Sequence, residues 1–423
     1  MSWRSVTGGL LAVVATAGLS ACGSRSEDGG GSSGGSPGVT DTTIKLGSSA
    51  SYSGPVAAYA TLTRSMEAYF KHVNEDEGGV KMADGKRRKI EFTAYDDGFD
   101  PARATANARR LVEQDEVFGL VGTLGTDPSV AMMDYLNKRE VPQAFVVTQS
   151  TNFGVDAAKH PWSIGFMPTI ASESGVFAGD LRKHGISGDA VAIFPNDAGG
   201  KNHLSGLQAA LGDGPVRLAK SESFQESDPT VNPQIAALQR TGSKVFFDLA
   251  PPKFAAQAIK RTHELGWTPR HYLPSQSNSI EATLKPAGLD KAKGVYSVAW
   301  LKDPNDPKWK DDPEVPKYRG VLRKYGQNLS ADDMISVQGY VQGEVVVRAL
   351  EQAQPTRRSF MDSVRNLRGL QLSMVLPGIE VNTGPDDAFP IESLYLEQFD
   401  GKRWVVEDEP VDLEGKTPKV HEK

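Results

Sequence analysis

The sequence predicts an α/β protein of two lobes, each built around a parallel sheet, and three observations support this fold class. Segments typical of buried strands begin near residues 90, 117 and 144, so a strand–helix unit recurs about every 27 residues. A second run of such units begins near Val191. A stretch with proline and aromatic residues at His160–Thr169 separates the two runs, which favours two lobes over one long sheet.

The clearest junction of strand and turn is Gly119–Thr126. Its first part is apolar, as in a strand that is buried on both faces, and glycines and hydroxyl-bearing residues follow. Asp127 is predicted to cap a helix with Pro128 at its first position, so that the helix covers about Ser129–Lys138. The free N–H groups of such a helix start favour an anionic or polar group in the adjoining cleft.

The other elements are predicted from periodicity and from start and stop signals. The expected strands are 44–46, 89–95, 117–121, 144–148, 191–194, 216–219, 245–249, 271–273, 295–300, 376–381, 393–399 and 403–406. The expected helices are 62–73, 101–112, 200–211, 232–240, 253–265, 318–325, 335–351 and 359–367. Asp400-Gly401 is expected to turn the last two strands into a hairpin.

The N-terminus is predicted to be a targeting segment rather than part of the fold. Residues 1–21 combine Arg4 with an apolar stretch of small residues, and Leu19–Cys22 resembles the lipobox of bacterial lipoproteins. That resemblance implies cleavage before Cys22 and a lipid on its thiol; the alternative is an ordinary secretory signal with a chance cysteine. Residues 22–40 are rich in glycine and serine and are expected to form a flexible tether.

Composition argues against several classes of function. The net charge of −6 argues against nucleic-acid binding. The single cysteine excludes intrachain disulfides and thiolate metal sites. The seven histidines show no metal-ligand spacing, and no nucleophile elbow or phosphate-binding loop is present. The sequence therefore predicts a protein that is not an enzyme and holds no metal and no cofactor.

Motifs along the chain resemble the type I periplasmic binding proteins of the leucine/isoleucine/valine-binding family. The resemblance lies in the order and spacing of Gly54–Tyr59, Asp100–Ala104, Val121-Gly122, Pro252–Ile259 and the segment 302–313. It implies two Rossmann-like lobes joined by three crossings, with a ligand between them, in the Venus-flytrap arrangement. It also implies closure of the lobes around the ligand.

From this resemblance we expect crossings near 166–168, 297–301 and 376–391. The first lobe then comprises residues 41–166 and 300–376, and the second comprises 167–299 and 377–412. Residues 413–423 form a polar tail that is expected to fray.

The resemblance also implies where the first lobe holds a ligand carboxylate. The matching positions are Thr126 and the run Gln149, Ser150 and Thr151, which are hydroxyl-rich turns at helix starts. The alternative is that these side chains only cap helices. Tyr59 matches a tyrosine that lines the family's pocket, although it could equally be a core residue of an amphipathic helix.

The second lobe departs from the family pattern. Gly199 stands where branched-chain amino-acid receptors have an aromatic residue, and the loop of Gln276 (275–278) lacks the carboxylate that would neutralise a ligand ammonium. We therefore expect a carboxylate without an amine, with an aromatic ring accepted near Phe166 and Trp300. The alternative is that Asp197 or Asp248 supplies the missing charge. The second-lobe candidates for ligand contact are Asn196, Asp197, Asp248 and Gln276.

Taken together, the sequence predicts the solute-binding receptor of an ABC importer for a small carboxylate, either an amino acid or an aromatic or other organic acid. The expected partners are the permease and ATPase subunits. The expected location is the outer face of the bacterial cytoplasmic membrane, through the lipid anchor, and the expected state is a monomer. The alternative is an extracellular sensor of the same fold that signals to a partner protein.

Overall fold

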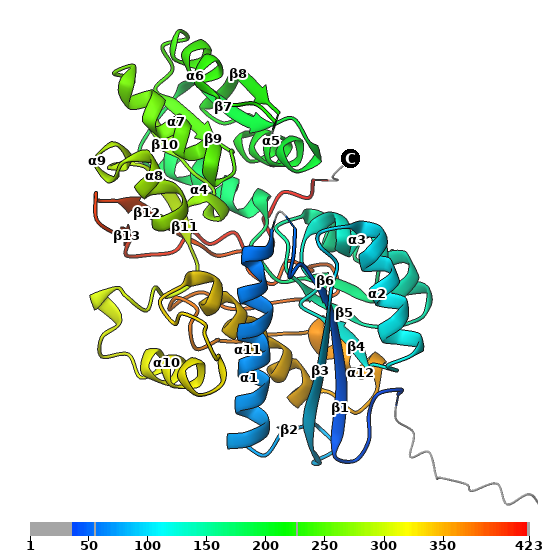
Figure 1. Ribbon diagram of the computed structural model, residues 1–423. Coiled ribbons are helices and arrows are strands. Elements are labelled where there is room, and N and C mark those ends of the chain that lie inside the picture. The colour runs from blue at the N-terminus through cyan, green and yellow to red at the C-terminus, as the bar shows by residue number, and fades with distance from the viewer. Residues whose placement is uncertain (1–35, 55, 226, 421–423) are drawn as a thin grey trace, which may run out of the picture. The chain divides into compact units, whose positions relative to one another are not determined.

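Two sheets organise the protein. The computed structural model describes residues 36–54, 56–225 and 227–420, so the predicted signal segment and Cys22 lie outside the described residues. One sheet has the order β2-β3-β1-β4-β5-β6, and the other has the order β13-β12-β11-β10-β9-β7-β8 (Figure 1). Both are mostly parallel and carry helices, which confirms the predicted fold class of two α/β lobes.

The first sheet is parallel except for the pairing of its short edge strand β2 with β3. Its strands are β1 (Thr43–Ala50), β2 (Val80–Lys81), β3 (Arg87–Asp96), β4 (Gly119–Val121), β5 (Gln143–Val146) and β6 (Ser163–Gly165). The helices of this half are η1 (Ala57–Tyr59), α1 (Ala60–Asp76), α2 (Pro101–Glu113), α3 (Thr126–Lys138), η2 (Thr151–Phe153), η5 (Pro307–Trp309), α10 (Glu314–Tyr325), α11 (Met334–Gln352) and α12 (Arg357–Val364). Helices α1 and α11 lie along one side of the strands, and α2 and α3 lie along the other (Figure 1).

The second sheet is parallel from β8 to β11 and antiparallel from β11 to β13. Its strands are β7 (Gly188–Pro195), β8 (Val216–Phe224), β9 (Val245–Asp248), β10 (Arg270–Tyr272), β11 (Tyr296–Ala299), β12 (Tyr395–Phe399) and β13 (Trp404–Val406). Its helices are α4 (Ile170–Lys183), α5 (Ala198–Leu211), α6 (Asn232–Gln239), α7 (Pro252–Glu264), η3 (Ser275–Ser277), η4 (Ile280–Leu284), α8 (Lys285–Ala287) and α9 (Leu289–Ala292). The predicted hairpin at Asp400-Gly401 is confirmed, because the Arg403 N–H donates to the Asp400 side chain and β12 pairs with β13.

Consecutive residues of β9 show that the second sheet is buried on both faces. Phe246 packs in one apolar cluster with Phe254 of α7, whereas Phe247 packs in another with Phe177 of α4. Both β9 rings are fully buried. Burial of each such side chain contributes about 1.5–3 kcal/mol to folding. Phe246 and Phe247 therefore hold β9 between the helices on its two faces.

The start of α3 corrects one prediction. The helix begins at Thr126 with Gly125 as its N-cap, and Asp127 lies in the first turn instead of capping the helix. Gly125 has φ +89°, and a Cβ there would lie 2.4 Å from the ring of Phe99. A glycine is therefore needed at this turn, and it takes the capping position that the Asp-Pro pattern had suggested for Asp127.

Two further segments differ from the predictions. The expected strand at 376–381 is wrong, because Val381 makes only an isolated bridge with Leu370. Helix α4 and the short helices between η3 and α9 were not predicted at all. Among the described residues no helix is both long enough and apolar enough to span a bilayer.

The chain passes between the two sheets three times within the described residues: after β6, after β11 and before β12. Aromatic rings join the first two passages, since Phe166 lies edge-on to Trp300 with ring centroids 6.0 Å apart. The third passage joins the second, because the N–H of Leu376 donates to the carbonyl of Trp300 at 2.9 Å. The expected lobe boundaries fall within these passages and stay a prediction.

Candidate functional site

Two hydroxyl-bearing turns of the first lobe lie together. Thr126 begins α3 after β4, and Thr148 follows the neighbouring parallel strand β5. Their Oγ1 atoms are 2.8 Å apart, and the N–H of Ser150 donates to Thr148 Oγ1 at 3.0 Å. Adjacent parallel strands end at the same edge of a sheet, which is why residues 22 positions apart share one hydrogen-bonded turn.

Gln149 connects these turns to the second lobe. Its Nε2 donates to Glu173 Oε1 at 2.6 Å and to Ser275 Oγ at 3.3 Å. Ser275 in turn donates its N–H to Glu173 Oε2 at 3.2 Å and its hydroxyl to Glu173 Oε1. Residues that follow β5 and β10 therefore meet at one carboxylate of α4.

Glu173 is a buried acid, and its hydrogen-bond donors among the described residues are neutral. Its side chain lies in the first turn of α4 and is 2% exposed. Burial raises its pKa to about 7, although the hydrogen bonds from Ser275 and Gln149 lower it in part. A buried carboxylate in such a setting favours a cation that could share the site.

Glu173 places a carboxylate beside the loop at 275–278, which has none of its own. The acid comes from α4, about 100 residues earlier in the chain, and not from the loop itself. A signal for this helix was present: Thr169 is an N-cap whose hydroxyl accepts from the N–H of Ser172 at 3.1 Å. Apolar residues at helical spacing, Val176, Phe177 and Leu181, then follow.

A second buried acid, Glu397 of β12, lies at the other end of the same loop. Its Oε1 accepts from Asn278 Nδ2 at 2.9 Å, and its side chain is 4% exposed. Burial, with a smaller contribution from the nearby carboxylates of Asp303 and Glu173, raises its pKa to about 8. Ser297 is its partner across the strands, and the buried Ser297 Oγ has no hydrogen-bond partner within the described part of the chain.

The C-terminal segment reaches the hydroxyl turn. The hydroxyl of Thr151 donates to the carbonyl oxygen of Val420 at 2.5 Å. The described residues 413–420, named here the C-terminal strap, therefore have defined contacts, and the expectation that the tail frays stays a prediction. Sequence reasoning missed this contact because a polar tail carries no periodic signal that identifies its partner.

A family model described as a periplasmic binding protein matches residues 43–403. The chain belongs to the periplasmic binding protein family. Its two lobes and mostly parallel sheets are those of the type I members.

Three relatives illustrate the range of ligands in proteins similar to this binding protein. The Leu/Ile/Val-binding protein homolog 7 of Brucella suis is 22% identical over 73% of this chain and 76% of its own. A branched-chain amino acid ABC transporter structure from Thermus thermophilus with bound valine has a TM-score of 0.74 at 14% identity, covering 88% of this chain and 97% of that one. The fatty acid ABC transporter substrate-binding protein of Thermomonospora curvata has a TM-score of 0.69 at 22% identity, covering 89% and 94%.

Two of the aromatic positions predicted for this binding protein have different surroundings. Tyr59 ends η1 at the start of α1 and is half-buried, and burial raises the pKa of its hydroxyl. Phe166 has no exposed surface and packs between Phe145 and Trp300. Tyr59 remains a candidate for ligand contact, whereas Phe166 has no free surface to offer.

Three polar positions predicted in the second lobe have structural partners. Asp197 caps α5 by accepting from the Gly200 N–H at 2.7 Å. Asp248 is fully buried with its Oδ2 3.2 Å from His271 Nε2, and burial raises its pKa. Asn196 is exposed, and its backbone N–H donates to the carbonyl of Phe224. Their contact with a ligand stays a prediction.

Gln276 and Gly199 are both exposed. Gln276 lies in η3, between Ser275 and Asn278, so it stands beside the loop residues that contact the two buried acids. A Cβ at Gly199 would meet Asp197 Oδ1 at 3.5 Å, and the expected room for a ligand ring at this position stays a prediction.

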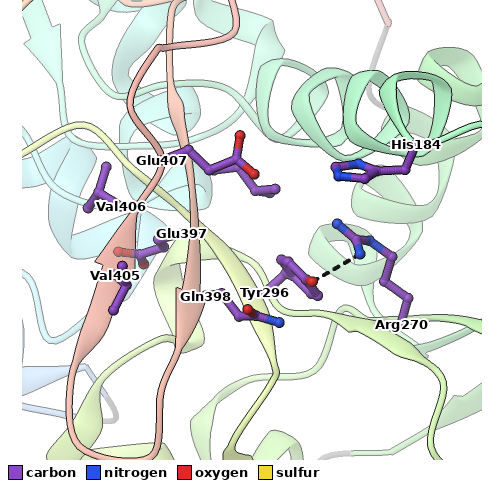
Figure 2. A pocket seen from close by; sticks show the side chains of 9 residues that line it. His184, Arg270, Tyr296, Glu397, Gln398, Val405, Val406 and Glu407 are labelled. Carbon is purple, nitrogen blue, oxygen red and sulfur yellow. Dashed lines mark hydrogen bonds between the residues drawn. The ribbon is translucent and has the colours of Figure 1, made fainter.

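Two cavities lie away from all of the predicted ligand-binding residues. One, of about 200 Å³, is lined by residues that include His184, Arg270 and Tyr296 (Figure 2). The guanidinium of Arg270 already has partners in the protein, because it donates to both oxygens of Asp180 at 2.7 Å and to the Tyr296 hydroxyl at 2.9 Å. The other, of about 320 Å³, is lined mainly by residues of α10, α11 and 371–379.

One trio of acids has the spacing of metal ligands. Carboxylate oxygens of Asp387, Glu392 and Glu414 lie within 4.8 Å of one another. Glu392 already accepts the backbone N–H groups of Gly415 and Thr417. The prediction of no metal site therefore stays a prediction.

Proposed function

We propose that this protein is the extracytoplasmic solute-binding receptor of an ABC importer and that its ligand is a small amino acid held between the lobes. The turns of Thr126, Thr148 and Ser150 supply neutral donors for the carboxylate, beside the start of α3. Glu173 faces the ammonium group from the second lobe. The observation that carries the proposal is the hydrogen-bonded connection from Gln149 to Glu173 and Ser275.

Glu173 also changes the choice of ligand. An amine-free acid was expected because the loop at 275–278 has no carboxylate, and the position of Glu173 beside Ser275 supports instead an acid from α4 as the source of that charge. A ligand ammonium would give this buried acid a charged partner, whereas a second carboxylate beside it would be repelled. The names of the valine-bound and Leu/Ile/Val-binding relatives support an amino acid, and the fatty acid relative keeps the amine-free alternative in the test.

The test compares L-leucine with 4-methylpentanoate, which has the same carbon chain and carboxylate without the amine. We expect leucine to raise the melting temperature of the full chain and 4-methylpentanoate to leave it unchanged. Glu173→Gln removes the charge at nearly constant size and is expected to weaken leucine binding roughly tenfold to a hundredfold, measured by titration calorimetry. The matched control is Glu281→Gln, because that acid is 75% exposed and pairs only with Lys285.

A clear result against this ligand is available. If 4-methylpentanoate binds and leucine does not, the receptor carries an amine-free acid as the sequence first suggested. If Glu173→Gln and Glu281→Gln both leave leucine affinity unchanged, Glu173 does not face the ammonium.

Attachment to the membrane is a separate part of the proposal. We propose that Cys22 carries a lipid and that residues 22–40 tether the binding lobes to the outer face of the cytoplasmic membrane, beside the permease. Mass spectrometry of the protein purified from membranes would show a diacylglycerol adduct on Cys22. A Cys22→Ser chain released into the soluble fraction would support the anchor, and one that stays in the membrane fraction would contradict it.

A further inference from the structure

The C-terminal strap (residues 413–420) is fastened to a buried carboxylate. The backbone N–H groups of Gly415 and Thr417 donate to Glu392 Oε2 and Oε1 at 2.9 and 3.3 Å. Glu392 is 1% exposed, so these bonds form away from water. Hydrogen bonds to a carboxylate are stronger than those between neutral groups, and they give the strap a defined path.

The strap then packs along the start of α4. Leu413 lies so close to this helix that a Cβ on Gly175 would be 2.6 Å from Leu413 Cδ1. The Thr417 hydroxyl is 3.0 Å from the Ser172 hydroxyl, and both side chains are buried. Ser172 precedes Glu173, so the strap lies beside the helical turn that carries the proposed ammonium partner.

The far end of the strap reaches the proposed carboxylate site. Thr151 begins η2 and donates its hydroxyl to the carbonyl oxygen of Val420. A threonine hydroxyl has one proton to donate, so it cannot donate to this carbonyl and to a ligand carboxylate at the same time. The Val420 carbonyl oxygen and a ligand carboxylate oxygen both accept hydrogen bonds at similar distances, so they would compete for the Thr151 hydroxyl.

We propose that the C-terminal strap is an intramolecular competitor of the ligand. Its Val420 carbonyl occupies Thr151 and leaves when a ligand carboxylate takes the same hydroxyl. This inference rests on the proposed function and adds its regulation: the apparent affinity is reduced by the fraction of molecules in which the strap is bound. Loosening the strap therefore tightens ligand binding without any change in the ligand's own contacts.

Titration calorimetry with L-leucine tests the competition in four full-length chains. Thr417→Val removes the hydroxyl contact with Ser172 at constant shape, and Leu413→Ala removes the packing on α4. Lys416→Ala is the matched control, because that side chain is exposed. We expect Thr417→Val and Leu413→Ala to bind leucine roughly three- to tenfold more tightly than the unaltered chain, because each loses about one hydrogen bond or contact of the strap. The control Lys416→Ala should bind leucine as the unaltered chain does.

Hydrogen exchange supplies a measurement that does not depend on the identity of the ligand. The amides of Gly415 and Thr417 are expected to exchange slowly in the unaltered chain and faster in Thr417→Val, and leucine should also accelerate them. Equal leucine affinity in all four chains overturns the competition and leaves the proposed function standing. If no chain binds leucine, the amino-acid ligand is wrong. Fast exchange of both amides in the unaltered chain overturns the proposal that the strap is held in place. Slow exchange that Thr417→Val accelerates supports it.

Discussion

The two lobes offer different chemistry at the candidate site. The turns after β4 and β5 of the first lobe present neutral hydroxyls, with Thr126 and Thr148 hydrogen-bonded to each other. The second presents buried acids, with Glu173 and Glu397 at the two ends of the η3 loop. Neutral donors can hold an anion over a wide range of pH, whereas buried acids respond both to a cation and to protons. We therefore expect ligand contacts at Thr126 and Thr148 to be insensitive to pH, and contacts at Glu173 and Glu397 to depend on it.

The largest expected effect tests whether breaking a buried ion pair of the second lobe costs more unfolding free energy than breaking an exposed pair of the first lobe. Arg270→Met leaves the Asp180 carboxylate, whose side chain is 2% exposed, without its guanidinium partner. Loss of one member of a buried pair costs about 3–5 kcal/mol of unfolding free energy. Urea denaturation followed by circular dichroism measures this loss.

The control for that variant is Arg139→Met in the first lobe. Arg139 is 55% exposed and pairs at 3.2 Å with Glu113, which is 42% exposed, so its loss should cost less than about 1 kcal/mol. Equal losses in the two variants would remove the contrast between the lobes.

A smaller effect concerns the pH dependence of stability. Burial holds the pKa of Glu397 at about 8, above the value of 4.5 for a free glutamate. A carboxyl whose folded pKa is raised contributes stability below pH 4.5 and loses it as the pH rises through about 8. We therefore expect the free energy of unfolding to fall by roughly 3–4 kcal/mol between pH 5 and pH 9.

Glu397→Gln should flatten this fall, while Glu281→Gln should leave it unchanged because Glu281 is exposed. Urea denaturation at pH 5, 7 and 9 provides the comparison. A fall of the same size in Glu397→Gln would show that other groups cause the pH dependence.

The smallest effect is expected in the first lobe. Thr126→Val removes the hydroxyl bonded to Thr148 at nearly constant size and should weaken leucine binding about fivefold. The factor should be the same at pH 6 and pH 8, since no titratable group is involved. Thr105→Val is the control, because that hydroxyl donates to the carbonyls of Pro101 in α2 and Ala131 in α3 and not to a residue of the candidate site. A pH-dependent factor would show that the two sides of the site are coupled.

The sequence predicted most of the fold because the relevant signals are local. The turn at Asp400-Gly401 and the helix start at Asp100 follow from neighbouring residues, and both are present in the structure. Helix α4 was missed although Thr169 marks its start, so Glu173 was missed with it.

Contacts between distant segments could not be predicted in the same way. Gln149 meets Ser275 across 126 positions, and Thr151 meets Val420 across 269. Such pairs depend on how the two sheets are placed, and no short-range pattern in the sequence encodes them. The resemblance to a family supplied the hydroxyl turns but had no counterpart for Glu173 or for the strap.

The contact of Phe166 with Trp300 gives the molecule an optical reporter. The indole is 5% exposed and lies edge-on to a ring from another passage between the sheets. We expect a rotation of one lobe against the other to turn these rings relative to each other and to change the surroundings of the indole. The emission spectrum of the unlabelled protein should then report that rotation, and replacing Trp300 by phenylalanine would identify its share among the six tryptophans.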